Sequence, residues 1–266
     1  MGLVLLLKSD QGVRRRRRLS SGGVGLFLAL LIPFSALSEG RYPESLWAED
    51  LLEKLRSGPS LLPADLDLRV PPPPSEAETG SELDWLEGLA TTARDESTVH
   101  LIRIEADAAL SGLLRASGLI PDPAAAPTLW GLLALVEAET AYFVLREKRV
   151  YARFRPGQLR PGLDSVIGTP AHPSYPSGHA AQASAAARLL SALHPACAES
   201  YRRFAAGVGL RREIAGVHYP SDTRAGERLA ETLVPRLLPL PRVAEAIPSA
   251  RAELSGLGPG CVGGDR

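Results

Sequence analysis

The feature that most constrains the fold is a helical hydrophobic repeat that proline interrupts at intervals. Apolar residues recur at helical spacing through most of the chain from residue 81 onward, and no segment alternates apolar and polar residues as a half-buried strand would. Proline lacks a backbone N–H and cannot continue a helix, so it separates one helical run from the next. The pattern predicts an all-α helical bundle, with helices over Leu83–Ala93, Val99–Leu114, Leu129–Phe154, Ser177–Leu193, Ser200–Ile214, Asp222–Leu238 and Val243–Leu254.

The first 38 residues have the pattern of an export signal. The arginine run Arg14–Arg18 precedes an apolar stretch, Val24–Leu37, and small residues stand just before Glu39. We interpret residues 1–38 as a signal peptide, which predicts a periplasmic or secreted protein with no stable membrane span after cleavage. An uncleaved anchor is the alternative, although the stretch is short for a bilayer span of roughly 20 residues. The export route stays open.

The rest of the chain divides into three segments by composition. Residues 39–80 are expected to hold a short helix at Glu44–Arg56 and a Pro-rich linker. Residues 81–255 are expected to form the helical domain, and residues 256–266 a flexible Gly-rich tail. The two cysteines, Cys197 and Cys261, could pair in an exported protein, but the sequence leaves their pairing open and we assign neither a catalytic role.

Charge excludes one class of partner. The chain has 30 basic and 30 acidic residues, and the first 38 residues hold six of the bases and one of the acids. The remainder therefore carries 24 bases against 29 acids. Because duplex binding usually needs a basic face, we expect no nucleic-acid partner. The apolar run 129–143 contains Glu137 and Glu139, which would be costly in lipid, so we predict a buried core helix there.

Three segments place cationic or imidazole groups beside a helix boundary. In the first, Lys148 and Arg155 are seven residues apart and are followed by Pro156. This separation predicts that both lie on one helix face, two turns apart, where they could clamp an oxyanion. The alternative is a solvated basic stripe that also includes Arg149 and Arg153.

The second segment begins a helix. Ser177 is expected to cap that helix, which leaves the amides of Gly178 and His179 free to bind an anion. Gly178 has no side chain to block a close approach, and His179 could give a proton to a departing alkoxide. A capped helix with a structural histidine is the alternative.

The third segment offers a nucleophile. His218 precedes Pro220 and a helix that we expect Ser221 to cap. Asp222, four residues further on, can bond to one ring nitrogen of His218 and leave the other free to attack, while Arg212 adds a cation. A surface histidine beside a capping aspartate is the alternative.

The three segments occur in the order and spacing of a known pattern: Lys, six residues, Arg-Pro; Pro-Ser-Gly-His; and Ser-Arg, five residues, His, three residues, Asp. The chain resembles the superfamily of type 2 phosphatidic acid phosphatases and vanadium haloperoxidases, and within it the bacterial class A nonspecific acid phosphatases. One position departs, because Arg211 stands where the pattern has serine; the departure concerns one supporting hydrogen bond and not the phosphate contact. The matching residues are Lys148, Arg155, Pro156, Pro176, Ser177, Gly178, His179, Arg212, His218 and Asp222.

The resemblance implies a role for each residue. Lys148, Arg155 and Arg212 would hold the phosphate oxygens, and Ser177 with the Gly178 amide would complete the cradle. No metal or other cofactor would be needed, since fixed cations can neutralise the phosphoryl oxygens.

The resemblance also implies the chemistry. His218 would attack phosphorus, Asp222 would orient it, and His179 would protonate the leaving group and then activate water. The chain would thus be a metal-independent acid phosphatase that hydrolyses small-molecule phosphate monoesters through a phosphohistidine.

Three other functions are weighed against this one. A vanadium-dependent haloperoxidase could use the same pocket, because vanadate has the geometry of phosphate. A membrane-associated lipid phosphatase should have several long apolar spans, of which this chain has at most one. A non-catalytic helical protein is the third. The sequence leaves open the preferred phosphomonoester, phosphotransferase activity and whether the chain forms a homo-oligomer.

Overall fold

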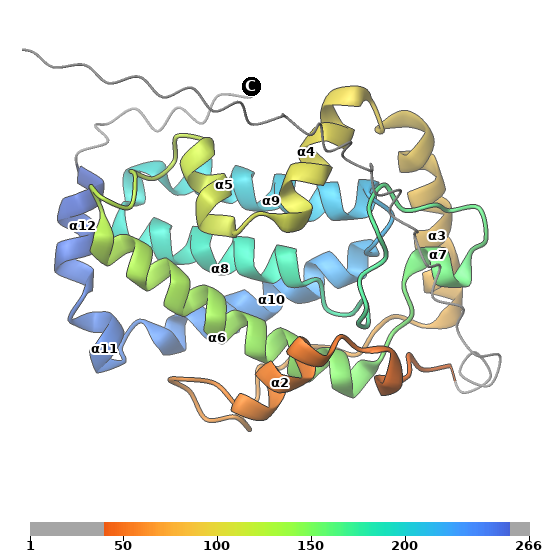
Figure 1. Cartoon of the computed structure of the whole chain (residues 1–266), viewed down its shortest axis with the longest axis horizontal. Helices are drawn as coiled ribbons and strands as arrows, with labels where there is room; N and C mark the ends of the chain where they lie inside the picture. The colour runs from red at the N-terminus through yellow and green to blue at the C-terminus, as the bar shows by residue number, and fades with distance from the viewer. Residues whose placement is uncertain (1–39, 256–266) are drawn as a thin grey trace, which may run out of the picture. The chain divides into compact units, whose positions relative to one another are not determined.

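A computed structural model of the chain describes residues 40–255, and its regular elements in that range are all helical, which confirms the all-α prediction (Figure 1). The predicted signal peptide, the tail from residue 256 and Cys261 lie outside the described residues. The elements are η1 (Glu44–Leu46), α2 (Glu49–Ser57), α3 (Glu76–Thr92), α4 (Glu96–Asp107), α5 (Leu110–Ala116), α6 (Pro127–Tyr151), α7 (Pro156–Leu159), α8 (Gly178–Leu193), η2 (Pro195–Cys197), α9 (Ala198–Ile214), α10 (Pro220–Leu237), α11 (Pro241–Ala244) and α12 (Ile247–Ser255).

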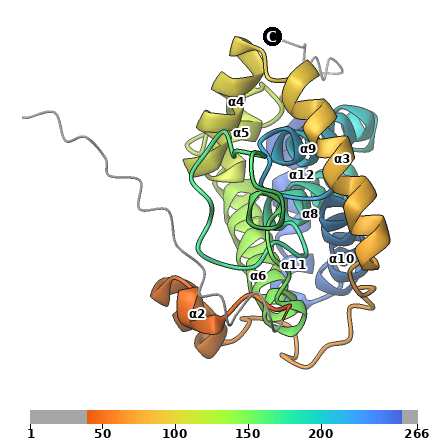
Figure 2. The same cartoon turned by 90° about the vertical axis from the view of Figure 1, so that its right-hand side faces the viewer.

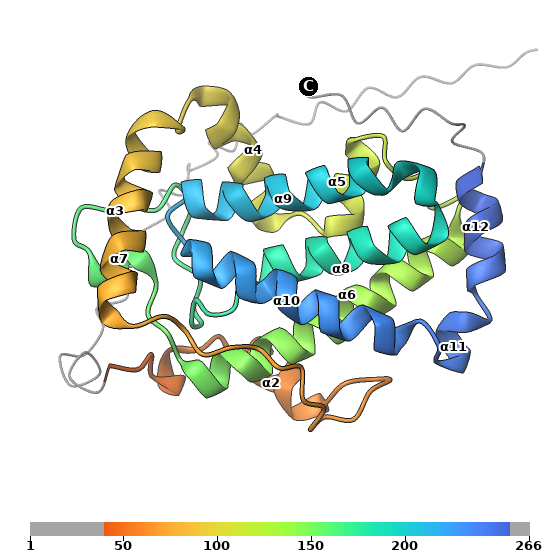
Figure 3. The ribbon, with the colours of Figure 1, turned by 180° about the vertical axis from the view of Figure 1, so that it is seen from behind.

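Helix α8 is the central helix of the bundle. It contacts α6, α9 and α10, which run beside it in both Figure 1 and Figure 3. Helix α12 crosses the bundle at the end where α8 finishes, to the left in Figure 1. The sequence of α8 is rich in alanine, and six of these alanines are buried. A helix that is buried on several sides needs apolar residues around most of its circumference, and small ones let its neighbours approach closely. The alanine run therefore explains the central position of α8.

Two glycines allow the helices beside α8 to come closest. A Cβ added at Gly226 in α10 would stand 2.6 Å from the Ser177 carbonyl oxygen and 2.9 Å from the Ala181 nitrogen. A Cβ added at Gly209 in α9 would stand 2.7 Å from Thr223 Cγ2. Both distances are shorter than ordinary carbon contacts of roughly 3.5–4.0 Å. Gly226 therefore lets the start of α8 lie against α10, and Gly209 lets α9 lie against α10.

Helix α3 stands across one end of the bundle, and Figure 2 shows it in front of that end. Helix α3 starts at Glu76, earlier than the sequence predicts, because Ser75 and Glu78 form a capping box. The single helix predicted over Val99–Leu114 was wrong. The backbone is extended at Ala108 and Ala109, so that α4 packs by Ile102 and α5 packs by Leu114 into a different apolar cluster.

Helix α6 ends earlier than predicted. Its last residue is Tyr151, and Ala152 follows in the left-handed conformation with φ 48°. Arg155 is extended, as a residue before proline tends to be, and precedes the short helix α7. The prediction that Lys148 and Arg155 share one helix face was therefore wrong.

Helix α6 also supplies much of the core. Leu129, Leu133, Val136 and Phe143 are buried in the main apolar cluster, as expected for a core helix. Among the described residues, the run Pro127–Leu159 is the one whose length and apolar composition would allow it to cross a membrane.

Candidate active site

The candidate site residues meet at one end of the bundle, to the right in Figure 1, where α6 and α9 end and α8 and α10 begin. Each of these boundaries has a local cause. Ser177 caps α8 by accepting a bond from the Ala180 nitrogen at 3.4 Å, as predicted. Helix α10 starts at Pro220 with Tyr219 as its capping residue, so the prediction that Ser221 is the cap was wrong. The helix starts there because the Asp222 carboxylate accepts the N–H of the capping residue Tyr219 at 3.1 Å.

His218 and Asp222 form a hydrogen-bonded pair. His218 Nδ1 lies 3.1 Å from Asp222 Oδ2. Because a carboxylate only accepts, the proton sits on Nδ1, and Nε2 keeps its lone pair. Arg155 Nη1 lies 3.4 Å from that Nε2. The imidazole is almost fully buried, so its unprotonated nitrogen faces a cation rather than solvent.

Lys148 is buried in the same region. Its Nζ donates to the carbonyl oxygens of Pro173 at 2.7 Å and Ser174 at 2.8 Å. A lysine ammonium has three N–H donors, so one remains for a further acceptor. The stripe interpretation fails for Lys148, Arg153 and Arg155, which are buried, and holds only for Arg149, which is exposed.

Arg155 is held by the loop that precedes α8. Its Nε donates to the His172 carbonyl at 3.2 Å, and its Nη1 donates to the Val217 carbonyl at 2.7 Å. Its Nη2 lies 3.2 Å from His172 Nδ1 and 3.4 Å from the Pro173 carbonyl. His172 is therefore a direct neighbour of this guanidinium.

Arg212 is the third buried cation. Its Nη2 donates to the Ile102 carbonyl at 3.0 Å and lies 3.5 Å from Glu105 Oε2. Its Nε is buried and has no hydrogen-bond partner among the described residues. A buried donor without a partner is uncommon and indicates a position where an acceptor can bind.

His179 lies in the first turn of α8 and, like Arg212, contacts the backbone of helix α4. Its Nε2 lies 3.1 Å from the Glu105 backbone oxygen, which can only accept, so the proton sits on Nε2. Nδ1 is then the nitrogen that can exchange a proton. A Cβ added at the neighbouring Gly178 would make only an ordinary contact of 3.6 Å with Val144, so packing does not require glycine there.

Burial and positive charge together favour the neutral form of the imidazoles. Burial, followed by the charges of Arg155 and Lys148, lowers the pKa of His218 well below its usual range. Burial and the charge of Arg212 lower the pKa of His179 to about 4. Burial also lowers the pKa of Arg155, to about 10, which still leaves the guanidinium charged at neutral pH. The site thus combines neutral imidazoles with fixed cations.

Sequence reasoning missed the carboxylate of Glu105. This residue is 4% exposed, and its Oε1 accepts from Arg211 Nε at 2.7 Å while its Oε2 faces Arg212. Arg211, which stands where the pattern has serine, forms an ion pair with the carboxylate that also faces Arg212. No motif marks Glu105, which is separated from Arg212 by 107 positions in the chain.

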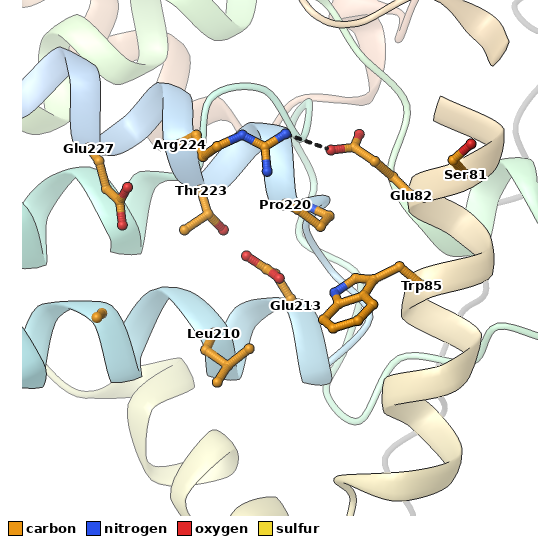
Figure 4. A pocket seen from close by; sticks show the side chains of 10 residues that line it. Ser81, Glu82, Trp85, Leu210, Glu213, Pro220, Thr223, Arg224 and Glu227 are labelled. Atoms are coloured by element: carbon orange, nitrogen blue, oxygen red, sulfur yellow. Dashed lines mark hydrogen bonds and ion pairs between the residues drawn. The ribbon is translucent and has the colours of Figure 1, made fainter. Parts of the chain in front are cut away.

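Sequence reasoning also missed Glu82 and the position of Arg153. Glu82 on α3 accepts from Ser221 and from Arg153, and Arg153 in turn donates to Asp222. Glu82 borders an open cleft of about 540 Å³ between α3, α9 and α10 (Figure 4). None of the candidate site residues predicted from the sequence lines that cleft.

Residues 127–237 match the model of the PAP2 superfamily. All eight candidate site residues lie inside this segment. The chain carries a PAP2 superfamily domain. The resemblance inferred from the spaced motifs is therefore confirmed, and the PAP2 segment runs from α6 to α10.

Two curated relatives cover part of the chain. It is 30% identical over 141 residues to the non-specific acid phosphatase of Salmonella typhi, an alignment that covers 50% of this chain and 56% of the relative. It is 38% identical over 79 residues to the decaprenylphosphoryl-5-phosphoribose phosphatase of Mycolicibacterium smegmatis, covering 30% and 42%. The chain thus spans about half the length of the curated relatives it matches.

The fold is similar to that of a solved enzyme. A bacterial vanadium-dependent iodoperoxidase superposes with a TM-score of 0.58 at 15% sequence identity, over 78% of this chain and 61% of that one. At this identity the likeness shows that the two chains share a helical fold.

Proposed function

We propose that this protein is an exported acid phosphatase that hydrolyses small-molecule phosphate monoesters through a phosphohistidine on His218. One observation carries the proposal: His218 Nδ1 is bonded to Asp222 while its Nε2 faces the buried guanidinium of Arg155. The PAP2 domain and the non-specific acid phosphatase of Salmonella typhi, a relative over half the chain, support it.

In this proposal three cations bind the phosphate oxygens. The third N–H of Lys148 and the unpartnered Nε–H of Arg212 are donors that an oxyanion can use. An unsatisfied buried donor costs about 1–3 kcal/mol, and a phosphate oxygen that accepts from Arg212 Nε removes this cost, which favours phosphate binding. The start of α8, capped by Ser177, adds backbone N–H groups and the positive end of the helix dipole.

The first step forms a P–N bond and breaks a P–O bond. The Nε2 lone pair of His218 attacks phosphorus in line with the leaving oxygen, while Nδ1–H stays bonded to Asp222 and that carboxylate stabilises the charge that develops on the ring. The departing alkoxide takes a proton from His179. A bound phosphate favours the protonated form of His179, because an adjacent anion raises the pKa that burial and Arg212 lower.

The second step reverses these roles. Neutral His179 accepts a proton from water, the water oxygen attacks phosphorus, and the P–N bond breaks to regenerate His218 and release inorganic phosphate. The fixed cations neutralise the equatorial oxygens throughout, which is the main requirement of phosphoryl transfer. We therefore expect dialysis against EDTA to leave phosphate release unchanged, and a loss restored by a divalent metal would contradict this part.

His218→Ala tests the mechanism, with His100→Ala as the matched control because His100 is exposed on α4. We expect turnover of p-nitrophenyl phosphate to fall at least roughly 1000-fold in the first variant only. Acid-labile, base-stable phosphate should be trapped on wild-type His218 and located by mass spectrometry. Full turnover by a folded His218→Ala protein would remove the mechanism.

Export is tested separately. We propose cleavage of the signal peptide before Glu39, and the expected result is recovery of the protein in the exported fraction with residues 1–38 missing by mass spectrometry. Recovery of an intact chain in the membrane fraction would instead support an uncleaved anchor.

A lipid phosphate is the second candidate substrate, because the Mycolicibacterium smegmatis relative is named a decaprenylphosphoryl-5-phosphoribose phosphatase. Comparing phosphate release from p-nitrophenyl phosphate and from a polyprenyl phosphate in detergent distinguishes the two. Bromide oxidation by vanadate-loaded protein, without phosphate release from either ester, would indicate a haloperoxidase instead.

A further inference from the structure

A buried arginine lies behind Asp222, on the side away from His218. Arg153 is 8% exposed, and its Nη1 donates to Asp222 Oδ1 at 2.7 Å and to Ser221 Oγ at 2.8 Å. Its guanidinium lies 3.7 Å from the centre of the Tyr219 ring. The two oxygens of Asp222 therefore have different partners, Arg153 on Oδ1 and His218 on Oδ2.

Glu82 of α3 completes this arrangement. Its Oε2 lies 3.1 Å from Arg153 Nη2 and accepts from Ser221 Oγ at 2.7 Å, and its Oε1 accepts from the Ser221 nitrogen at 2.6 Å. Figure 4 shows Glu82 reaching from α3 toward the start of α10, with a longer bond to the exposed Arg224. Glu82 is 11% exposed and lies before the PAP2 segment, which starts at residue 127.

We propose that Arg153 and Glu82 are positioning residues for His218, which they orient through Asp222. This inference rests on the proposed function, because it assigns the two residues a part in the attack on phosphorus. A carboxylate rotates easily about its last side-chain bond unless both oxygens are held. Arg153 holds the oxygen that His218 leaves free, so the other oxygen stays directed at His218 Nδ1.

The hydrogen bonds of Arg153 separate this role from phosphate binding. Its Nη1 donates to Ser221 and Asp222, and its Nη2 donates to Thr79 Oγ1 at 3.0 Å and to Glu82. These bonds use all four N–H groups on the two terminal nitrogens. A phosphate oxygen would have to displace one of these bonds, whereas Lys148 and Arg212 each keep a donor, and Arg155 frees an Nη1–H when the Nε2 lone pair of His218, 3.4 Å away, attacks phosphorus.

The test compares Arg153→Met with Arg149→Met, because Arg149 is an exposed arginine from the same segment. We expect Arg153→Met to lower kcat for p-nitrophenyl phosphate on the order of 10- to 100-fold, as losses of residues that orient a catalytic group commonly do. The inhibition constant of inorganic phosphate should stay within about twofold, since the phosphate-binding cations are unchanged. Arg149→Met should match wild type in both. A weaker inhibition constant with unchanged kcat, or no change in either, would overturn the proposal.

Glu82→Gln provides a milder variant in case Arg153→Met does not fold. The amide keeps an oxygen that can accept from Ser221. It removes the negative charge of Glu82, which competes with Asp222 for the positive charge of Arg153. Arg153 then neutralises Asp222 more fully, so the acidic limb of kcat/KM, which reports protonation of His218, should move to lower pH. An unmoved or oppositely moved limb would contradict the positioning role.

A measurement without turnover separates this inference from the proposed function. NMR titration of the His218 ring in Arg153→Met should show a higher pKa than in wild type, because a nearby cation is lost. Lys148, Arg155, His179 and Arg212, which also act on that ring, remain in place. If the wild type releases no phosphate but the pKa rises, the positioning contact stands and the proposed function fails. If phosphate is released through His218 and the pKa does not change, the positioning role fails alone.

Discussion

Replacing Gly226 with alanine tests the close contact between α8 and α10. The new Cβ would stand 2.6 Å from the Ser177 oxygen and 2.9 Å from the Ala181 nitrogen, and both are backbone atoms that cannot rotate away. Overpacking of this kind costs up to about 3 kcal/mol, and the better helix propensity of alanine offsets about 1 kcal/mol. The net loss of about 2 kcal/mol corresponds to a fall in Tm of roughly 4–8 °C for a domain of this size.

The same change should also reduce activity, because it lies against the start of α8. The Ser177 nitrogen donates to the Asp222 carbonyl at 2.9 Å, and a forced separation of the helices lengthens this bond. Gly131→Ala is the matched control, since no atom lies within 4 Å of an added Cβ on that exposed position of α6. The control should raise Tm by about 1–4 °C without changing turnover. Equal Tm values for the two variants, measured by differential scanning fluorimetry, would refute the packing argument.

Two further outcomes are expected. Glu105→Gln should weaken phosphate binding more than it lowers kcat, with the inhibition constant of phosphate rising on the order of 10-fold, because one charge that holds Arg212 is lost; an unchanged constant would show that Glu105 does not position Arg212. Thermal stability should fall as the pH drops from about 6.5 toward 4, because a histidine in the unfolded chain takes up a proton near 6.5 whereas folded His179, with its pKa lowered to about 4, does not. His179→Gln should lose less Tm over that range than wild type does, and parallel curves would contradict the assignment.

The sequence allowed prediction of the features that depend on residues close together in the chain. The helix start at Ser177 follows from a capping residue. The contact between His218 and Asp222 follows from a separation of four residues at a helix start. The all-α fold class followed from the helical spacing of the apolar residues alone. In each case the interacting groups are near each other in the chain, so spacing determines whether they can meet.

The remaining contacts depend on how distant segments pack. Glu105 meets Arg211, and Glu82 meets Ser221, across 106 and 139 positions, and neither glutamate differs in sequence from a solvated helix residue. The turn at Ala152 ends α6 between Lys148 and Arg155, and it has no glycine that would mark it in the sequence. Tertiary packing decides these features, and a periodicity argument contains no information on it.

The origin of Glu82 and Glu105 sets the length of chain that the site requires. Both carboxylates come from α3 and α4, ahead of the segment by which the superfamily is recognised. A fragment trimmed to that segment would keep every residue of the signature but leave Arg212 without Glu105 and leave Arg153 with Asp222 as its one remaining carboxylate partner among the described residues. We therefore expect the minimal functional unit to begin some fifty residues upstream of the recognisable one, at the start of α3.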